Sequence, residues 1–508
     1  MEKKISSGVI LVIRDGWGYR KTKKGNALAE VPTPCTDALM RDYPNTLLSA
    51  AGRAVGLPPG YIGNSEVGHI TLGSGRIILQ PFEEINESIR DRSFFKNDAF
   101  LSAISNCKKN GSTLHLISIL QKEGVHGHLD HLFALLDLCK KQHFYQVYVH
   151  ALTDGRDSPV TKSVFHVKAL IKKFKLLGLG KIATISGRYY GMDRDKRWDR
   201  TKLYYDCVVH GICAEEFEDP LAALSQCHAR HETDEFIKPR KLHGYGGIKS
   251  NDSVLFVNFR TDRPRQFTRA VVEEDFEGWQ RKPLPVYYVA MTQYYQPMRA
   301  HVAFGERKIS NVLGEVISRN GLMQLRITET EKYAHVTYFF NGQNEKQFEG
   351  EDRIMIPSLN VATYDLAPEM RVHDITKKLI ESIKEKRYRF IIVNLVNGDM
   401  VGHTGVKKAI WAAVKAIDGC LGEITREGLA HGYTLLVTSD HGNVEDQTSK
   451  WRTSHTVNPV PFILVTTEQK RYDLQSGKGL RDVAPTILAL LGLKKPKEMT
   501  GENLLREK

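Results

Sequence analysis

The chain has 508 residues, more than one typical hydrophobic core holds, so we expect two domains. It is 41% hydrophobic and 26% charged, as in ordinary globular proteins, and no apolar run approaches the ~20 residues that a membrane span requires. The formal net charge of +13 is compatible with an anionic small-molecule substrate, with nucleic-acid binding or with a solvated lysine-rich surface. The lysine runs lack interleaved aromatic residues, which argues against nucleic acid.

Cysteine usage and the N-terminus both indicate a reducing compartment. The seven cysteines are dispersed and include no Cys-x-x-Cys pair. The apolar run from Gly8 to Ile13 is too short for a signal peptide and reads as a first strand. Cys227 and His231 could form part of a soft metal site, but no second cluster completes it. We therefore expect a cytoplasmic protein.

Three apolar runs end in acidic or histidine motifs. Ile10 to Ile13 precedes Asp15, Ile391 to Leu395 precedes Asp399, and Leu435 to Thr438 precedes Asp440 and His441. Such runs are typical of strands buried on both faces of a parallel sheet. Ligands of α/β sheets bind at the carboxyl ends of the strands, so we expect these side chains to converge.

Ser65 lies in a short polar stretch, Gly63 to His69, after the first of these runs. We expect a helix from Glu66 to Leu72. The free N–H groups and positive dipole end of a helix N-terminus suit an incoming phosphoryl group. Ser65 is therefore a candidate nucleophile with an accessible hydroxyl. The alternative is that Ser65 only caps the helix.

A block with its own strands and helices separates Ser65 from Asp399. The expected elements are strands at Leu114 to Leu120, Gln146 to His150, Lys181 to Ile185 and Val254 to Asn258, and a helix at Val164 to Leu177. We infer a discontinuous metal-binding domain, residues 1–79 and 311–508, interrupted by an inserted substrate domain, residues 80–310. Further on, apolar residues from Ile410 to Ile424 recur at helical spacing and predict a core-facing helix.

The last motifs complete a metal-type ligand set. Asp399 and His403 are four residues apart, so one helical turn can place both on one face. His455 lies just before the apolar run Pro461 to Val465. Together with Asp15, Ser65, Asp440 and His441, these residues offer a mixed nitrogen and oxygen set. That set suits Mn²⁺ or Zn²⁺ better than Mg²⁺.

Taken together, the motifs resemble those of the cofactor-independent phosphoglycerate mutases, within the alkaline phosphatase superfamily. The resemblance spans nearly the whole chain in the family's order: Gly63 to His69, Asp154 to Asp157, Ser186 to Asp195, Asn258 to Arg260, Glu329 to Thr337, Asp399 to Gly405 and Asp440 to Asn443. It implies an α/β fold: an alkaline-phosphatase-like metal domain with a parallel-type sheet flanked by helices, plus an inserted second α/β domain.

The resemblance also implies a cofactor and residue roles. Two divalent metals would be bound, Mn²⁺ first, with Mg²⁺, Co²⁺ or Zn²⁺ as alternatives. One would be held by Asp15, Ser65, Asp440 and His441, and the other by Asp399, His403 and His455. Ser65 would take the phosphoryl group and Asp157 would shuttle a proton. The substrate would contact His126, Arg156, Asp157, Arg188, Arg194, Arg260, Arg263 and Lys332.

The implied reaction interconverts 3-phosphoglycerate and 2-phosphoglycerate through a phosphoserine, without 2,3-bisphosphoglycerate. We expect a monomer that binds neither nucleic acid nor a membrane. The alternatives are another phosphatase or phosphomutase of the superfamily, such as a phosphopentomutase, and a non-enzymatic basic binding protein. The arginines and Asp157 argue against a plain phosphatase, which has no reason to hold its dephosphorylated product.

The chain departs from the family's pattern at four places. Gln121 to Gly124 replaces a Ser-Asp-Gly-Gly lead-in to His126, Gly127 replaces a serine, and Thr261 and Gly398 replace prolines. These changes affect the loops and leave the reacting groups in place.

Overall fold

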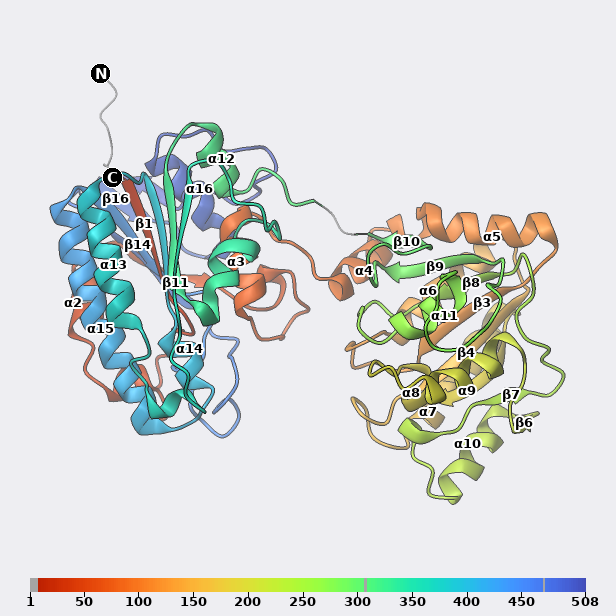
Figure 1. Cartoon of the computed structure of the whole chain (residues 1–508). Helices are drawn as coiled ribbons and strands as arrows, with labels where there is room; N and C mark the ends of the chain where they lie inside the picture. Colours follow the sequence, from red (N-terminus) through yellow and green to blue (C-terminus); the bar gives the residue numbers. More distant parts are fainter. Residues whose placement is uncertain (1–7, 306–307, 469–470) are drawn as a thin grey trace. The chain divides into compact units, whose positions relative to one another are not determined.

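The computed structural model describes residues 8–305, 308–468 and 471–508. The chain forms two compact units (Figure 1). The first unit consists of Met1–Gln80 and Lys308–Lys508, and the second unit of Pro81–Arg307. Each unit is built around a mostly parallel sheet with helices packed on it, which confirms the predicted α/β fold class. Among the described helices, none combines the length and the apolar character needed to cross a bilayer.

The first unit contains, among the described residues, a sheet of eight strands. Their order is β12 (Glu351–Ile356), β11 (Gln324–Glu329), β13 (Phe390–Leu395), β1 (Gly8–Arg14), β14 (Tyr433–Thr438), β15 (Val460–Val465), β2 (Asn45–Ser49) and β17 (Lys478–Gly479). The strands from β12 to β14 are parallel, whereas β15 is antiparallel to β14. Every residue of β1, β13 and β14 is buried, as expected for a sheet covered on both faces.

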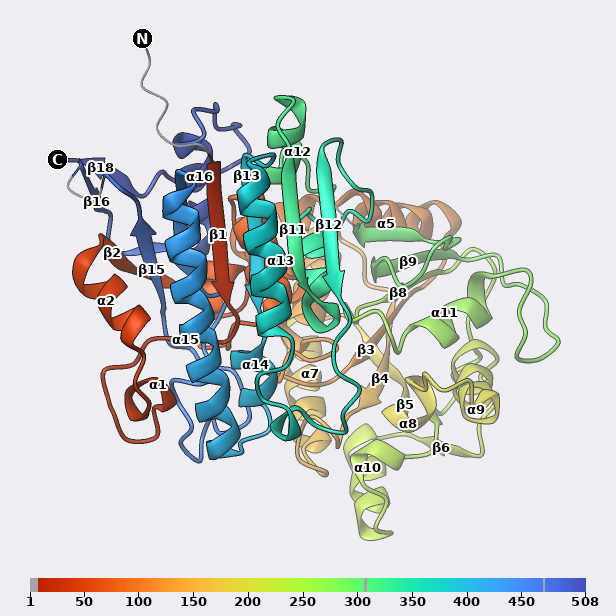
Figure 2. The ribbon, with the colours of Figure 1, turned by 60° about the vertical axis from the view of Figure 1, so that its left-hand side comes forward.

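Helices cover both faces of this sheet (Figure 2). One face packs against α1 (Ala27–Glu30), α2 (Pro34–Asp42), α13 (Val372–Glu385), α14 (Asn397–Gly402) and α15 (Lys407–Ala430). The apolar stripe predicted from Ile410 to Ile424 is the buried face of α15. The other face packs against α3 (Ser65–Ser74), α12 (Leu313–Arg319), α16 (Val483–Leu490) and a π-helix at His335–Phe339. Strands β16 (Tyr472–Leu474) and β18 (Leu505–Glu507) form a small separate ladder.

The parallel strands carry polar side chains to one edge of the sheet. Asp15 directly follows β1, and Asp440 lies two residues after β14. Asp399 lies in α14, which begins two residues after β13. β15 runs antiparallel to β14, so His455, which precedes β15, lies at the same edge. The next residue, Thr456, forms an isolated β-bridge with Gly442. Strand direction therefore explains how these distant positions meet.

The second unit repeats the layered arrangement. Among the described residues its sheet has the order β10 (His301–Phe304), β9 (Tyr287–Thr292), β8 (Ser253–Phe256), β3 (Leu114–Ile119), β4 (Val147–Thr153), β5 (Lys181–Gly187), β7 (Arg240–Leu242) and β6 (Glu215–Phe217). The strands from β10 to β5 are parallel. The four strands predicted for this block are present as β3, β4, β5 and β8.

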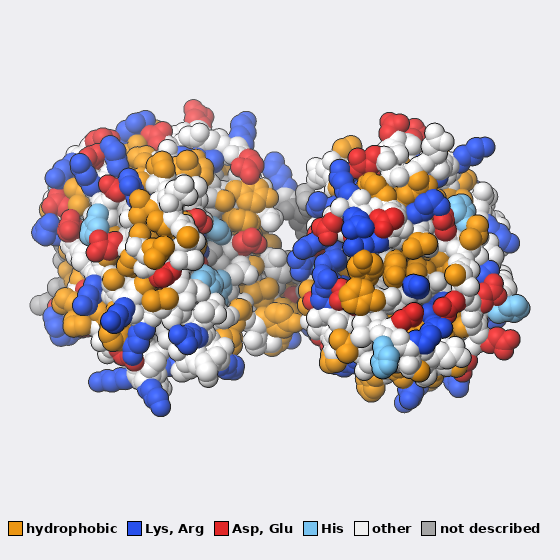
Figure 3. All heavy atoms as spheres, turned by 60° about the horizontal axis from the view of Figure 1, so that its bottom comes forward, with side chains coloured by type: hydrophobic (Ala, Val, Ile, Leu, Met, Phe, Trp, Pro, Cys, Tyr) orange, Lys and Arg blue, Asp and Glu red, His pale blue; other side chains and the backbone are white. Residues whose placement is uncertain are grey.

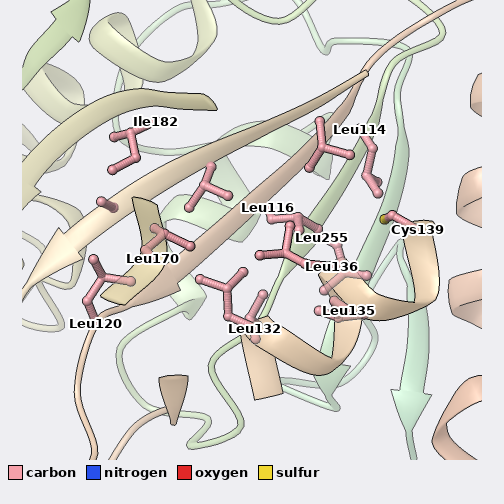
Figure 4. Close-up of a cluster of buried hydrophobic side chains, with 14 of the residues drawn as sticks. Leu114, Leu116, Leu120, Leu132, Leu135, Leu136, Cys139, Leu170, Ile182 and Leu255 are labelled. Atoms are coloured by element: carbon pink, nitrogen blue, oxygen red, sulfur yellow. The ribbon is translucent and has the colours of Figure 1, made fainter. Parts of the chain in front are cut away.

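Two cores hold the helices on this second sheet. One face packs against α4 (Pro81–Arg90), α5 (Asp98–Asn110), α6 (Leu129–Lys141), α7 (Ser163–Leu177) and α10 (Pro220–Ala229). Figure 4 shows leucines of β3, α6 and α7 meeting in this core. The other face packs against α9 (Trp198–Val209) and α11 (Arg265–Val272), while the short α8 (Arg188–Gly191) follows β5. The predicted helix from Val164 to Leu177 is confirmed as α7.

The surface carries both signs of charge. On the face shown in Figure 3, Lys and Arg side chains are interspersed with Asp and Glu on each unit. This mixed pattern fits the solvated-surface interpretation of the net charge of +13.

Candidate active site

Ser65 is the first residue of α3, and its neighbour caps the helix. The Asn64 side chain accepts a hydrogen bond of 3.1 Å from the Val67 N–H. The alternative that Ser65 serves as the cap is therefore wrong. Ser65 is also only 5% exposed, so the expectation of an accessible hydroxyl is wrong as well. Burial holds the hydroxyl among charged side chains of the sheet edge.

The Ser65 hydroxyl lies between an imidazole and an ammonium group. Its Oγ is 2.9 Å from His441 Nε2 and 2.5 Å from Lys332 Nζ. Lys332 also donates to Asp15 at 2.9 Å and to Asp399 at 2.7 Å. Burial alone would lower the pKa of Lys332, but the Asp15 and Asp399 carboxylates outweigh burial and raise it. Lys332 therefore stays charged and can stabilise negative charge on the serine oxygen.

Asp399 faces two histidines whose orientation is fixed by backbone carbonyls. Its Oδ1 lies 3.2 Å from His403 Nε2 and 3.1 Å from His455 Nε2. Nδ1 of His403 lies 3.0 Å from the Thr453 carbonyl oxygen. Nδ1 of His455 lies 2.8 Å from the Gly63 carbonyl oxygen. When Nδ1 donates to a carbonyl, Nε2 keeps its lone pair for a metal. The predicted Asp399 and His403 pair does lie on one helical turn.

The donor set fits divalent metal ions. Among the described residues, three groups place their ligand atoms close together: Asp399, His403 and His455; Asp15, Asp399 and His441; Asp15, His69 and Asp440. Asp440 Oδ2 is buried without a hydrogen-bond partner, whereas Oδ1 accepts from the backbone N–H groups of Gly16 and His441. A buried carboxylate oxygen without a partner is costly unless a cation satisfies it. Six of the seven predicted ligands belong to these groups, and the seventh, Ser65, lies beside them with its Oγ 2.9 Å from His441 Nε2.

Sequence reasoning missed two buried residues that support the predicted ligands, His69 and Asn394. His69 Nδ1 lies 2.9 Å from the Ser65 carbonyl, and its Nε2 lies 3.1 Å from the Asn394 amide nitrogen. The same amide nitrogen donates to Asp15 Oδ2 at 2.7 Å. Burial lowers the pKa of His69 to about 4, so the ring is neutral with both nitrogens engaged. His69 therefore orients its neighbours, and its nitrogens are not free for a metal. One signal was available: Ser65 and His69 are one helical turn apart.

At Gly398, where the family's pattern has proline, the backbone lies close to the end of β1. A Cβ at this position would lie 2.4 Å from the Asp15 carbonyl oxygen, closer than any side chain permits. Glycine therefore lets the start of α14, which carries Asp399, approach the end of β1, which carries Asp15.

A second polar cluster lies at the carboxyl ends of β3, β4 and β5, in the second unit. Arg188 is at its centre: Nη1 donates to Asp154 at 2.6 Å and to Asp157 at 2.5 Å, and Nη2 lies 2.9 Å from His126 Nε2. Burial alone would raise the pKa of Asp157, but the hydrogen bond and the charge of Arg188, with smaller contributions from His126 and Arg263, together outweigh burial and lower it. Burial, followed by the charge of Arg188, lowers the pKa of His126 to about 3. The free protein therefore presents a carboxylate and a neutral imidazole.

Four further arginines of the second unit make individual contacts. They are Arg194 with Asp262 at 2.8 Å, Arg260 with Asp262 at 3.3 Å, Arg156 with Glu235 at 2.7 Å, and Arg263 with the Met192 carbonyl at 2.9 Å. Arg263 Nε is buried without a partner. Burial and then the neighbouring arginines lower the pKa of Arg263. Such a concentration of guanidinium groups suits a small anion with carboxylate or phosphate oxygens.

The predicted site residues thus form two groups. The first unit holds Asp15, Ser65, Lys332, Asp399, His403, Asp440, His441 and His455. The second unit holds His126, Arg156, Asp157, Arg188, Arg194, Arg260 and Arg263. The first group contains the residues predicted as nucleophile and metal ligands together with Lys332, and the second contains the other predicted substrate contacts and Asp157.

Comparisons with known proteins agree with this arrangement. Residues 7–495 match the Metalloenzyme superfamily. The chain is 48% identical over 507 residues to 2,3-bisphosphoglycerate-independent phosphoglycerate mutase 1 of Methanosarcina barkeri, covering 98% of each chain. It is 47% identical over 508 residues to the 2,3-bisphosphoglycerate-independent phosphoglycerate mutase of Acetivibrio thermocellus, covering 98% of this chain and 99% of the relative.

A solved structure extends the similarity to the fold. The phosphoglycerate mutase of Leishmania mexicana, crystallised at low cobalt concentration, aligns with a TM-score of 0.62 and 30% identity, covering 100% of this chain and 99% of that one. These comparisons confirm the resemblance inferred from the motifs. The chain belongs to the metalloenzyme superfamily and, within it, to the 2,3-bisphosphoglycerate-independent phosphoglycerate mutases.

Proposed function

We propose that this protein interconverts 3-phosphoglycerate and 2-phosphoglycerate through a phosphoserine on Ser65. The observation that carries the proposal is the position of the Ser65 hydroxyl, 2.9 Å from His441 Nε2 and 2.5 Å from Lys332 Nζ. A serine surrounded by metal-type ligands and a fixed ammonium is arranged for phosphoryl transfer. The Arg188 cluster supplies what a mutase needs in addition, which is a means to keep glycerate bound between two transfers.

We assign two divalent metals to the first unit and favour Mn²⁺. Asp15, Ser65, Asp440 and His441 would hold one ion, and Asp399, His403 and His455 the other. Bound metals would stabilise the serine alkoxide and the charge of the phosphoryl oxygens. The mixture of imidazole and carboxylate ligands is the reason for preferring Mn²⁺ to Mg²⁺.

The first half-reaction moves the phosphoryl group to the enzyme. The Ser65 hydroxyl gives up its proton and its oxygen bonds to the phosphorus of 3-phosphoglycerate. The bond from phosphorus to substrate O3 breaks, and O3 takes up a proton, so glycerate remains. Lys332 donates a hydrogen bond to the reacting serine oxygen. In the second half-reaction O2 of glycerate loses its proton and takes the phosphoryl group from Ser65.

Asp157 is the group to which we assign the proton transfers on glycerate. In the free protein Arg188 holds it as a carboxylate, because their hydrogen bond of 2.5 Å lowers the pKa of Asp157 although burial acts in the opposite direction. A substrate carboxylate that competes for Arg188 would weaken this pairing. Asp157 could then supply a proton to O3 in the first transfer and accept the proton that O2 loses in the second. In the reverse direction O2 receives the proton and O3 loses it.

An assay without bisphosphoglycerate tests the proposal. Purified protein with Mn²⁺ is incubated with 3-phosphoglycerate, and the phosphorus spectrum is followed by NMR. Formation of 2-phosphoglycerate supports the proposal. Release of inorganic phosphate alone would assign the protein to the phosphatases of the superfamily, and no reaction would refute both.

Metal dependence has its own test. Activity should vanish in excess chelator and return when Mn²⁺ is restored, and metal analysis should find two ions per chain. An enzyme that remains active in chelator would contradict the ligand assignment. We further propose that the protein is a cytoplasmic monomer, in keeping with its seven free cysteines.

A further inference from the structure

Gln121 lies in the loop that follows β3, and it is fully buried although it belongs to none of the predicted site residues. Its side-chain Oε1 accepts hydrogen bonds from the backbone N–H groups of Val125 at 3.0 Å and His126 at 3.4 Å. Its backbone carbonyl accepts from the Leu129 N–H at 2.9 Å, at the start of α6. One residue therefore fixes both the middle and the end of the loop that carries His126.

The amide nitrogen of Gln121 connects this loop to a second one. Nε2 donates to Asp154 Oδ2 at 3.1 Å. The other oxygen of Asp154 accepts from Arg188 Nη1 at 2.6 Å, and from the N–H groups of Arg156 and Asp157. Since Arg188 Nη2 lies 2.9 Å from His126 Nε2, the contacts close a ring through four residues: Gln121, Asp154, Arg188 and His126. The ring joins the ends of β3, β4 and β5.

Only an amide can complete this ring. Oε1 accepts from two N–H groups while Nε2 donates to the Asp154 carboxylate. Glutamate would keep the acceptor but place a second carboxylate beside Asp154. An apolar side chain would leave two N–H groups and one carboxylate oxygen buried without partners, which is costly.

At Gly127 the loop has no room for a side chain that could replace the contacts of Gln121. A Cβ at Gly127 would lie 2.8 Å from Ile119 Cγ2 and 3.0 Å from Asn258 Oδ1. Asn258 is held there because its Oδ1 accepts from the Ile119 N–H at 3.0 Å. A side chain at position 127 would therefore displace the strand end. Gln121 holds the N–H groups of Val125 and His126, while the His126 carbonyl accepts from the Phe259 N–H at 2.9 Å.

We propose that Gln121 is a positioning residue for phosphoglycerate binding. Its amide holds the His126 loop against Asp154, so that His126, Arg188 and Asp157 face the substrate in one fixed arrangement. The inference rests on the proposed function, because it assigns those three residues to the substrate. Both Gln121 and Gly127 are positions where this chain departs from the family's pattern, so the anchor is a feature of this sequence.

The test uses two variants of the full chain and one control. Gln121→Met removes every side-chain hydrogen bond at similar volume, and Gln121→Glu keeps the acceptor but removes the donor. Gln324→Met is the control: Gln324 is also fully buried, and its amide donates to the Gly314 carbonyl at 2.8 Å in the first unit. Two quantities are measured with Mn²⁺ present: kcat and KM for 3-phosphoglycerate, and hydrogen exchange of the 122–128 amides without substrate.

Gln121→Met should increase exchange of the 122–128 amides at least tenfold and raise KM at least tenfold, with a smaller change in kcat. Gln121→Glu should leave exchange within threefold of the wild type but still raise KM at least fivefold, because Asp154 loses its donor. Gln324→Met should change neither quantity by more than twofold.

Unchanged exchange in Gln121→Met, or faster exchange with KM within twofold of the wild type, would overturn the positioning role. A wild-type protein that does not act on 3-phosphoglycerate would instead refute the proposed function. The exchange measurement, which needs no substrate, separates these two failures.

Discussion

The ammonium nitrogen of Lys332 lies 2.5 Å from the hydroxyl oxygen of Ser65, across 267 residues of sequence. The same nitrogen bridges the carboxylates of Asp15 and Asp399 at 2.9 and 2.7 Å. One fixed positive charge thus holds together two predicted metal ligands and the predicted nucleophile. In a buried site such a charge stabilises a serine alkoxide far more than it would in water.

Replacing this charge should impair catalysis strongly. Lys332→Met is expected to lower kcat by about 10²- to 10³-fold, the usual effect of removing one donor aimed at developing negative charge. It also removes the ammonium group that bridges two buried carboxylates, so the Tm measured in chelator should fall. Steady-state kinetics and thermal unfolding check both effects. Activity within tenfold of the wild type would show that Lys332 has no role in phosphoryl transfer.

Asn394 should affect metal binding rather than substrate binding. Asn394→Asp replaces the amide that donates to Asp15 with a carboxylate, which repels it. Loss of such an outer contact to a metal ligand costs about 10- to 100-fold in metal affinity. Calorimetric titration with Mn²⁺ measures this change. The matched control is Asn341→Asp, since Asn341 is a buried amide that donates to Glu351 at 2.8 Å. Equal Mn²⁺ affinity in the two variants would contradict the assignment.

Stability should fall in mild acid because of buried neutral histidines such as His131. Burial lowers the pKa of His131 from 6.5 to about 3. Between these values the unfolded chain binds a proton that the folded chain does not, so stability decreases as pH falls from 6.5 toward 3. Each such group contributes a slope of about 1.4 kcal/mol per pH unit in that window.

The variant His131→Gln tests this pH dependence, because glutamine can still meet Asn86, which lies 2.9 Å from His131 Nε2, and does not titrate. Denaturant unfolding at several pH values should give a shallower loss of stability below pH 6.5 than in the wild type. Identical slopes in His131→Gln and the wild type would exclude His131 as a contributor.

Asp157→Asn separates proton transfer on glycerate from the chemistry at Ser65. The substitution should reduce isomerisation by about 10²- to 10⁴-fold, the range for loss of a general acid or base. Hydrolysis of the phosphoserine enzyme should fall much less, because Asp157 belongs to the second unit and the metal-type ligands to the first. Quenched-flow measurement of the rates of phosphoryl transfer to glycerate and of phosphoserine hydrolysis checks this prediction. An equal fall in transfer and hydrolysis would make Asp157 a structural residue.

Much of the first group of site residues could be predicted from strand patterns. Asp15, Asp399 and Asp440 follow apolar runs, and parallel strands bring such residues to one edge whatever their separation in sequence. His455 follows no such rule, because β15 is antiparallel and its starting end lies at that edge. Its place could be inferred only from the resemblance.

The residues that sequence reasoning missed act through tertiary contacts. Asn394 sits inside an apolar strand and Gln121 just beyond one, and a lone amide in such a run gives no sign of its partner. The burial of Ser65 was also unpredictable, since a Gly-Asn-Ser stretch is equally compatible with an exposed turn. Lys332 likewise reaches Ser65 only through the fold, because nothing in its local sequence indicates which carboxylates it will neutralise.

The most direct test of the account is to trap the covalent intermediate. Wild-type protein with Mn²⁺ is mixed with phosphorus-labelled 3-phosphoglycerate, quenched within milliseconds and digested for mass spectrometry. We predict a labelled phosphoserine at Ser65, and we predict that Ser65→Ala carries no label and loses activity by about 10³-fold or more. Label on another residue, or a Ser65→Ala variant within tenfold of wild-type activity, would contradict Ser65 as the nucleophile.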